Sequence, residues 1–140
     1  MRPLFCAMDL RICAEVFAEM MAHVAAAMPA EACGFLSGRE GVACRHFPIP
    51  NVSPNPHCFR MEPQAQIDAL YAIAAAAEEP LAIYHSHPHG PAALSPTDLA
   101  QLPAGDILHV IIAWPQAAQP QVRVFAWRHM NVTEVTWYMV

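Results

Sequence analysis

A short apolar run that continues into two histidines constrains the fold of this 140-residue chain more than any other feature. The run at 81–84, LAIY, follows the breaker EEP at 78–80 and continues into HSHP at 85–88. Four apolar residues are too few for a helix, and the lack of a polar interruption predicts a strand buried inside a sheet. The chain therefore needs further strands and covering helices around this run.

The rest of the sequence predicts those surrounding elements. Apolar residues recur every three or four positions over 12–27, which predicts an amphipathic helix with Asp9 at its N-cap. A second helix is expected over 63–77, and a short one from Ser95 to about Leu102. Strands are expected over 3–8, 33–37, 42–49, 107–113, 122–127 and 132–138, the second and third forming a hairpin. This order predicts a single α/β domain over residues 1–140, with one mixed sheet flanked by helices.

Charge and composition narrow the classes of function. The chain has 7 basic and 12 acidic side chains, a net charge of −5, and its basic residues are scattered arginines, with no lysine. Because nucleic-acid binding needs clustered basic residues, we expect no nucleic-acid partner. No apolar stretch reaches the roughly 18 residues of a membrane span, and the first residues lack the pattern of a signal peptide. We therefore expect a cytoplasmic protein without a membrane partner.

The two histidines after the apolar run are candidate metal ligands. Side chains two residues apart in a strand point to the same face, so His85 and His87 can converge on one ion. The pair alone is a weak signal, because eight histidines in 140 residues give about 0.5 such pairs by chance. Requiring Pro88, Ser95 and Asp98 as well lowers this expectation to the order of 10⁻⁵ to 10⁻⁴. Two imidazoles and the carboxylate of Asp98 would leave one tetrahedral position of a zinc ion open, as catalytic sites do.

Other interpretations of these residues stay open. Ser95 and Asp98 also have the spacing of a helix capping box, with Pro96 at the first helical position. Glu31 is a candidate general base at the start of a buried strand, although an isolated Glu is usually a solvated surface residue. Imidazole ligands favour Zn²⁺ over Mg²⁺ or Ca²⁺ but leave Co²⁺ and Ni²⁺ open. The five cysteines are an odd number without a C-x-x-C pair, and we interpret them as small buried residues.

Taken together, these residues resemble the signature of the JAMM (MPN+) metalloproteases, E…H-S/T-H-P-x₆-S-x₂-D. Glu31 precedes ACGFLSG, the HSHP motif begins at His85, and Ser95 and Asp98 follow at the spacing of the signature. The stretches 31–38 and 50–54 also look like those of small bacterial and archaeal members. The resemblance covers nearly the whole chain.

The resemblance implies a cytidine-deaminase-like α/β fold and hydrolysis of the bond after the Gly-Gly tail of a ubiquitin-like or sulfur-carrier protein. It implies one Zn²⁺ per chain, bound by His85, His87 and Asp98. Glu31 would be the general base, and Ser95 would donate a hydrogen bond to the oxyanion. The chain has no room for the insertions by which larger relatives select ubiquitin linkages, so we expect a bacterial carrier protein whose tail adds to a sheet edge.

Three alternatives compete with this hypothesis. A catalytically silent scaffold would bind a ubiquitin-like tail without cleaving it, although such relatives usually lose a ligand. A zinc deaminase would need the H-x-E and P-C-x-x-C motifs, which the sequence lacks. A cupin-type site is excluded because the first Glu after His87 is Glu134. The identity of the carrier, the leaving group, the role of His89 and the oligomeric state, a homodimer included, stay open.

Overall fold

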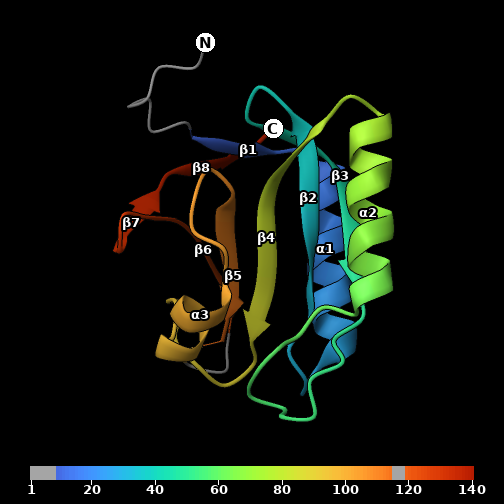
Figure 1. Cartoon of the computed structure of the whole chain (residues 1–140). Helices are drawn as coiled ribbons and strands as arrows, with labels where there is room; N and C mark the ends of the chain where they lie inside the picture. Colours follow the sequence, from blue (N-terminus) through green and yellow to red (C-terminus); the bar gives the residue numbers. More distant parts are fainter. Residues whose placement is uncertain (1–8, 115–118) are drawn as a thin grey trace.

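A mixed sheet is the framework of the domain (Figure 1). The computed structural model describes residues 9–114 and 119–140, and the strand order within them is β7-β6-β5-β4-β2-β3-β1-β8. The strands are β1 (Leu10–Ile12), β2 (Cys33–Arg39), β3 (Val42–Ile49), β4 (Glu79–His87), β5 (Leu108–Ala113), β6 (Gln121–Arg128), β7 (Asn131–Val135) and β8 (Trp137–Met139). The helices are α1 (Ala14–Ala27), α2 (Pro63–Ala75) and α3 (Pro96–Gln101). The predicted mixed α/β fold is confirmed, and the apolar run of the sequence lies in β4, between β5 and β2.

Alternating side chains of the inner strands divide the core between the two faces of the sheet. Leu36 and Tyr84 join the cluster that packs under α1, whereas their neighbours Phe35 and Ile83 join the cluster under α2. Figure 1 shows α1 behind β2 and β3. Because side chains two residues apart share a face, His85 and His87 follow Ile83 onto the α2 face.

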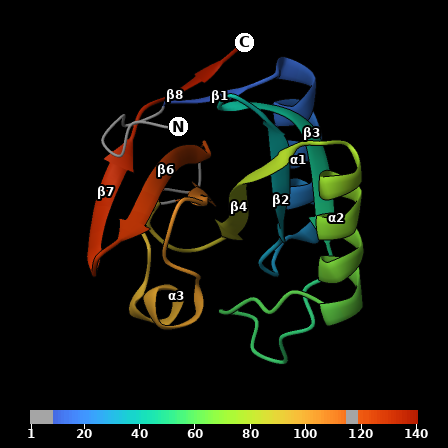
Figure 2. The same cartoon turned by 45° about the horizontal axis from the view of Figure 1, so that its top comes forward.

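The two edge strands of the sheet are consecutive in the chain. β7 pairs antiparallel with β6, whereas β8, which follows after Thr136 alone, pairs parallel with β1 at the other end of the strand order. The sheet therefore curls until its edges approach each other, as Figure 2 shows for β7 and β8. The single strand predicted over 132–138 is wrong, because the chain passes from one edge to the other at Thr136.

The start of the chain also differs from its prediction. The first helix begins at Ala14, and Cys13 rather than Asp9 occupies the N-cap, without a side-chain cap hydrogen bond. The preceding residues form β1, where buried Leu10 and Ile12 alternate with exposed Arg11, and this alternation is typical of a strand. The strand predicted over 3–8 lies outside the described residues. None of the helices in the described part of the chain is long and apolar enough to cross a bilayer.

A close approach between β2 and β4 depends on a glycine. A Cβ atom at Gly34 would lie 2.5 Å from a ring carbon of Tyr84. The hydroxyl of Tyr84 is hydrogen-bonded to His23 of α1 and to His46 of β3, the latter at 2.7 Å. Glycine at position 34 thus leaves space for a polar contact that joins α1 to the sheet, on the face opposite His85 and His87.

Candidate metal centre

His85 and His87 converge at the end of β4, as the sequence predicts. Their Nε2 atoms are 3.0 Å apart, and the residues are 0% and 8% exposed. The strand continues through His87 because β5 pairs with it in parallel up to Ala113. Cys33 of β2 lies opposite His85 on the other side. Both rings therefore sit on a strand that is paired along both edges.

Asp98 comes to the two imidazoles from the first turn of α3. Its Oδ2 atom lies 3.1 Å from Nε2 of His85 and 3.2 Å from Nε2 of His87. The same oxygen accepts a hydrogen bond from the backbone N–H of Ser95 at 2.9 Å, and Ser95 Oγ accepts one from the N–H of Asp98 at 3.1 Å. The capping box expected from the sequence is thus present, and it directs the carboxylate toward the histidines.

The loop after β4 orients the ring of His87. Nδ1 of His87 is 2.8 Å from the carbonyl oxygen of Pro91. Because a carbonyl only accepts hydrogen bonds, Nδ1 carries a proton, and Nε2 of the neutral ring can then offer its lone pair to an ion placed beside Asp98 and His85. A second hydrogen bond of this kind is the usual partner of a metal-binding histidine.

Nε2 of His85, Nε2 of His87 and Oδ2 of Asp98 have nearly the separations of three ligands in a tetrahedral zinc site. Ligands at 2.0–2.1 Å from Zn²⁺ in tetrahedral geometry are about 3.3–3.4 Å apart. The observed separations between the two Nε2 atoms and Oδ2 are 3.0–3.2 Å, so shifts of a few tenths of an ångström would admit the ion. Two imidazoles and one carboxylate also form the donor set of catalytic zinc sites that keep a fourth position open.

Glu31 is a second carboxyl group beside the histidines. Its ligand atom lies within 4.8 Å of those of His85 and His87, and the residue is only 6% exposed. Asn51 donates a hydrogen bond to the carbonyl of Glu31 at 2.9 Å, and the next residue, Ala32, donates to Oγ of Ser86 at 2.8 Å. These bonds fix the backbone on both sides of the Glu31 side chain. Its Oε1 is buried and has no hydrogen-bond partner among residues 9–114 and 119–140.

The two carboxyl groups have opposite electrostatic character. The pKa of Glu31 is raised to about 7, mainly by burial; His87 acts to lower it, and Asp98 acts to raise it. Burial also acts to raise the pKa of Asp98, but hydrogen bonds from His85 and His87 outweigh it and hold that pKa well below its ordinary value. Asp98 is therefore an anion suited to a cation, whereas Glu31 can exchange a proton near neutral pH.

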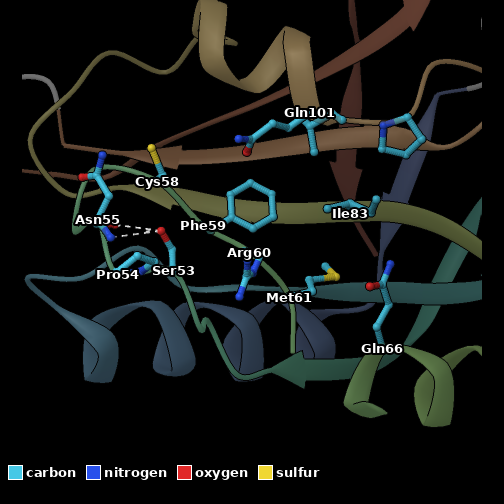
Figure 3. Close-up of a pocket in the computed structure, with 12 residues that line it drawn as sticks. Ser53, Pro54, Asn55, Cys58, Phe59, Arg60, Met61, Gln66, Ile83 and Gln101 are labelled. Carbon is cyan, nitrogen blue, oxygen red and sulfur yellow. Dashed lines mark hydrogen bonds between the residues drawn. The ribbon is translucent and has the colours of Figure 1, made fainter. Parts of the chain in front are cut away.

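A pocket of about 570 Å³ lies between the 53–61 segment, Ile83 of β4 and the end of α3 (Figure 3). Phe59 lines it and stacks on the ring of His85, with 4.5 Å between the ring centroids. The other lining residues are Ser53, Pro54, Asn55, Cys58, Arg60, Met61, Gln66, Ile83, Gln101, Leu102 and Pro103. Arg60 is the only charged residue in this lining, so the pocket combines an apolar floor with one cation.

Sequence reasoning missed several residues that hold the site. Phe59, Ser86 and Asn51 were not assigned to it, because their contacts with His85, Ala32 and Glu31 join segments far apart in the chain. The repeated prolines and the two asparagines of residues 48–56 did predict an irregular loop there. His89, whose role the sequence left open, is exposed in the turn after β4.

The fold and this cluster define a class of protein, an α/β domain with two histidines and a carboxylate at the end of an inner strand and a second, buried carboxyl beside them. The family of prokaryotic homologs of the JAB domain matches residues 13–130. The chain belongs to this family, which confirms the resemblance found in the sequence.

Several relatives of the chain are named as a protease, a peptidase or a desampylase. The chain is 32% identical over 127 residues to the CysO-cysteine peptidase of Mycobacterium tuberculosis, an alignment that covers 89% of this chain and 87% of the relative. It is 42% identical over 84 residues to a probable TtuB-protein conjugate cleaving protease of Thermus thermophilus, covering 59% of this chain and 56% of that one. A desampylase of Haloferax volcanii is 35% identical over 74 residues, covering 50% and 52%. These names agree with the predicted class of activity.

Solved structures confirm the fold. A protein of Desulfitobacterium hafniense superposes with a TM-score of 0.84 at 28% identity, covering 94% of this chain and 92% of its own. A JAB1/MPN domain protein from Archaeoglobus fulgidus superposes with a TM-score of 0.64 at 17% identity, covering 94% and 98%. The arrangement of strands and helices is therefore that of JAB/MPN domains.

Proposed function

We propose that this chain is a zinc-dependent peptidase or isopeptidase that hydrolyses the bond after the Gly-Gly tail of a ubiquitin-like or sulfur-carrier protein. The main support is the triangle formed by Nε2 of His85, Nε2 of His87 and Oδ2 of Asp98, with the buried carboxyl of Glu31 beside it. The ligand atom of Glu31 lies within 4.8 Å of those of His85 and His87. A cation-binding site and a proton-exchanging group beside it are the two parts that hydrolysis by an activated water needs.

Each side chain has a separate role in this proposal. His85, His87 and Asp98 hold one Zn²⁺, which lowers the pKa of water and polarises the scissile carbonyl. Glu31 takes a proton from the attacking water and passes it to the leaving nitrogen, a task that suits a carboxyl group with a pKa near neutrality.

Ser95 donates its hydroxyl proton to the carbonyl oxygen as negative charge develops there. Its Oγ already accepts the N–H of Asp98, and a hydroxyl that accepts one hydrogen bond still has its own proton to donate. The cap thus positions the hydroxyl without using its proton. Such a donor is typically worth 10²–10³ in kcat.

We further propose that the carrier tail lies along residues 59–61. The N–H of Val52 donates to the carbonyl of Arg60 at 2.8 Å, and the N–H of Glu62 donates to that of Pro50 at 2.9 Å. In an extended segment the main-chain groups of Phe59 and Met61 then point to the opposite side, where a peptide strand can pair with them. Phe59 also narrows the approach to His85, which favours residues without bulky side chains next to the cluster.

The names of the relatives support a carrier-type substrate. A CysO-cysteine peptidase and a protease that cleaves TtuB-protein conjugates are both named for a bond to a carrier protein. By this analogy, the leaving group here is an amino acid or a conjugated amine. We also propose that residues 1–140 form a single domain of the family and that the protein is cytoplasmic, without a nucleic-acid or membrane partner.

The decisive test incubates the zinc-loaded protein with the Gly-Gly-tailed carrier proteins of its own organism. Each carrier is prepared in a processed form and in a form extended or conjugated after the second glycine. Mass spectrometry should show that only the extended form is shortened, to the Gly-Gly end, and that Glu31→Gln abolishes the reaction. Binding of the processed carrier without any cleavage, with zinc bound in stoichiometric amount, would instead favour the silent scaffold.

A further inference from the structure

The two imidazoles of the cluster differ in how their second nitrogen is held. Nδ1 of His87 is hydrogen-bonded to the carbonyl of Pro91, which leaves its Nε2 as the ligand atom. Nδ1 of His85 is buried and has no hydrogen-bond partner within the described residues, although the ring is 0% exposed. If Nε2 of His85 binds the ion, Nδ1 carries the proton and is a buried donor without an acceptor. Such a group is costly unless a partner completes it.

His109, on the neighbouring strand β5, carries a buried hydrogen-bond acceptor to which no described residue donates. His109 of β5 is 0% exposed, and its Nε2 is 3.1 Å from the carbonyl oxygen of Pro103. The carbonyl can only accept, so Nε2 carries the proton of the neutral ring and Nδ1 is left as an acceptor. That Nδ1 is also buried, and no residue that the structure describes is hydrogen-bonded to it.

The sheet register brings these two rings to the same face. In the parallel strands β4 and β5, His109 pairs with Ile83, and Ile111 pairs with His85. Ile83 and His85 are two residues apart and share a face, so His109 lies on the same face of the sheet as His85. Burial lowers the pKa of His109 to about 4, and His85 acts in the same direction. Cys33, opposite His85 on β2, offers only a weak sulfur acceptor, and its thiol donates to the carbonyl of Ile49.

We propose that Nδ1 of His109 accepts a hydrogen bond from Nδ1–H of His85 through one buried water molecule, and that His109 is thus a positioning residue for the metal ligand. This inference rests on the proposed function, because it assigns Nε2 of His85 to the ion. A buried water needs at least two polar partners, and the strand register puts the donor of His85 and the acceptor of His109 on the same face of neighbouring strands. The relay holds His85 in the tautomer whose Nε2 lone pair is available to the ion. His85 thereby has a hydrogen-bond acceptor for its Nδ1 proton, as His87 has in the carbonyl of Pro91.

A matched pair of variants separates this role from a packing role. In His109→Asn the amide oxygen can stand where Nδ1 stands, so the acceptor is kept while the bond to Pro103 is lost. In His109→Gln the longer side chain can keep a donor for the carbonyl of Pro103, but the acceptor near His85 is lost. Zinc affinity, measured by competition with a chromophoric chelator, should weaken roughly 10–100-fold in the Gln variant and stay close to wild type in the Asn variant.

Nitrogen-15 NMR of labelled histidines in the zinc-loaded protein gives a second measurement that is independent of activity. With Nε2 of His85 on the ion, Nδ1 carries the proton in each variant, and the relay sets the hydrogen bond made by that proton. We expect the Nδ1–H resonance of His85 to match in the wild type and the Asn variant and to shift in the Gln variant. Equal zinc affinity in the Gln variant and wild type, or an Nδ1–H resonance of His85 that is unchanged in the Gln variant, would overturn the relay. If the zinc affinities and the NMR resonances are as expected but no carrier protein is cleaved, only the proposed substrate is rejected.

Discussion

Replacing Glu31 by Gln should make the metal-free protein more stable while abolishing its activity. The carboxyl group is 6% exposed, and its Oε1 has no hydrogen-bond partner in the described structure. Burial therefore raises its pKa from the ordinary value of 4.5 to about 7. A buried group that must ionise at physiological pH destabilises the fold, and a neutral amide of the same shape removes that cost.

The size and the pH range of the effect follow from this pKa. The difference between 4.5 and about 7 corresponds to about 3 kcal/mol, at 1.36 kcal/mol for each pKa unit. Below pH 4.5 the carboxyl is protonated in both the folded and the unfolded states, so the two proteins should differ little. Between pH 4.5 and about 7 the wild type loses stability relative to the variant, because the unfolded state ionises first, and above pH 7 the difference levels off. Because the amide is also a buried polar group, we expect a gain of about 1–3 kcal/mol at pH 8.5.

Urea unfolding of both proteins with a chelator present, from pH 4.5 to pH 8.5, measures this difference directly. Glu40→Gln, at an exposed residue in the turn between β2 and β3, is the control and should show no such pH dependence. With zinc restored, the Glu31→Gln protein should bind the ion but leave extended carriers uncut. A constant difference between the Glu31 proteins over the whole pH range would refute the argument from burial.

Three further substitutions test the site and its support. Ser95→Ala should leave the zinc content unchanged in metal analysis, lower kcat by about 10²–10³ and cost about 1 kcal/mol in urea unfolding through the lost cap; an unchanged kcat would remove Ser95 from the mechanism. Asp98→Asn should abolish stoichiometric zinc, since the amide is a poor ligand, and metal analysis finding one zinc per chain would reject the ligand set. Tyr84→Phe should cost about 1–3 kcal/mol of unfolding free energy, because it leaves His23 and His46 without their shared hydroxyl. It should not change zinc affinity, since Tyr84 points away from the cluster, and a large loss of zinc binding would contradict that placement.

Local patterns in the sequence predicted much of this domain. The apolar run 81–84 predicted an inner strand, and the spacing of the HSHP motif, Ser95 and Asp98 predicted both the converging imidazoles and the capping box. These features depend on strand period and on helix-start chemistry, which act over a few residues. The prediction of a helix capped by Asp9 was wrong, because pairing of β1 with β3 and β8 outweighed the helical periodicity near Ile12.

The sequence by itself determined which groups are available for chemistry and the face of the strand on which His85 and His87 stand. Only the tertiary structure decided how those groups are held. The stacking of Phe59 on His85, the bond from Asn51 to the carbonyl of Glu31, and the pairing of His109 with Ile83 join segments that lie 20 or more residues apart. Such contacts follow from the order and register of the strands, which depend on the packing of the whole sheet rather than on any local pattern.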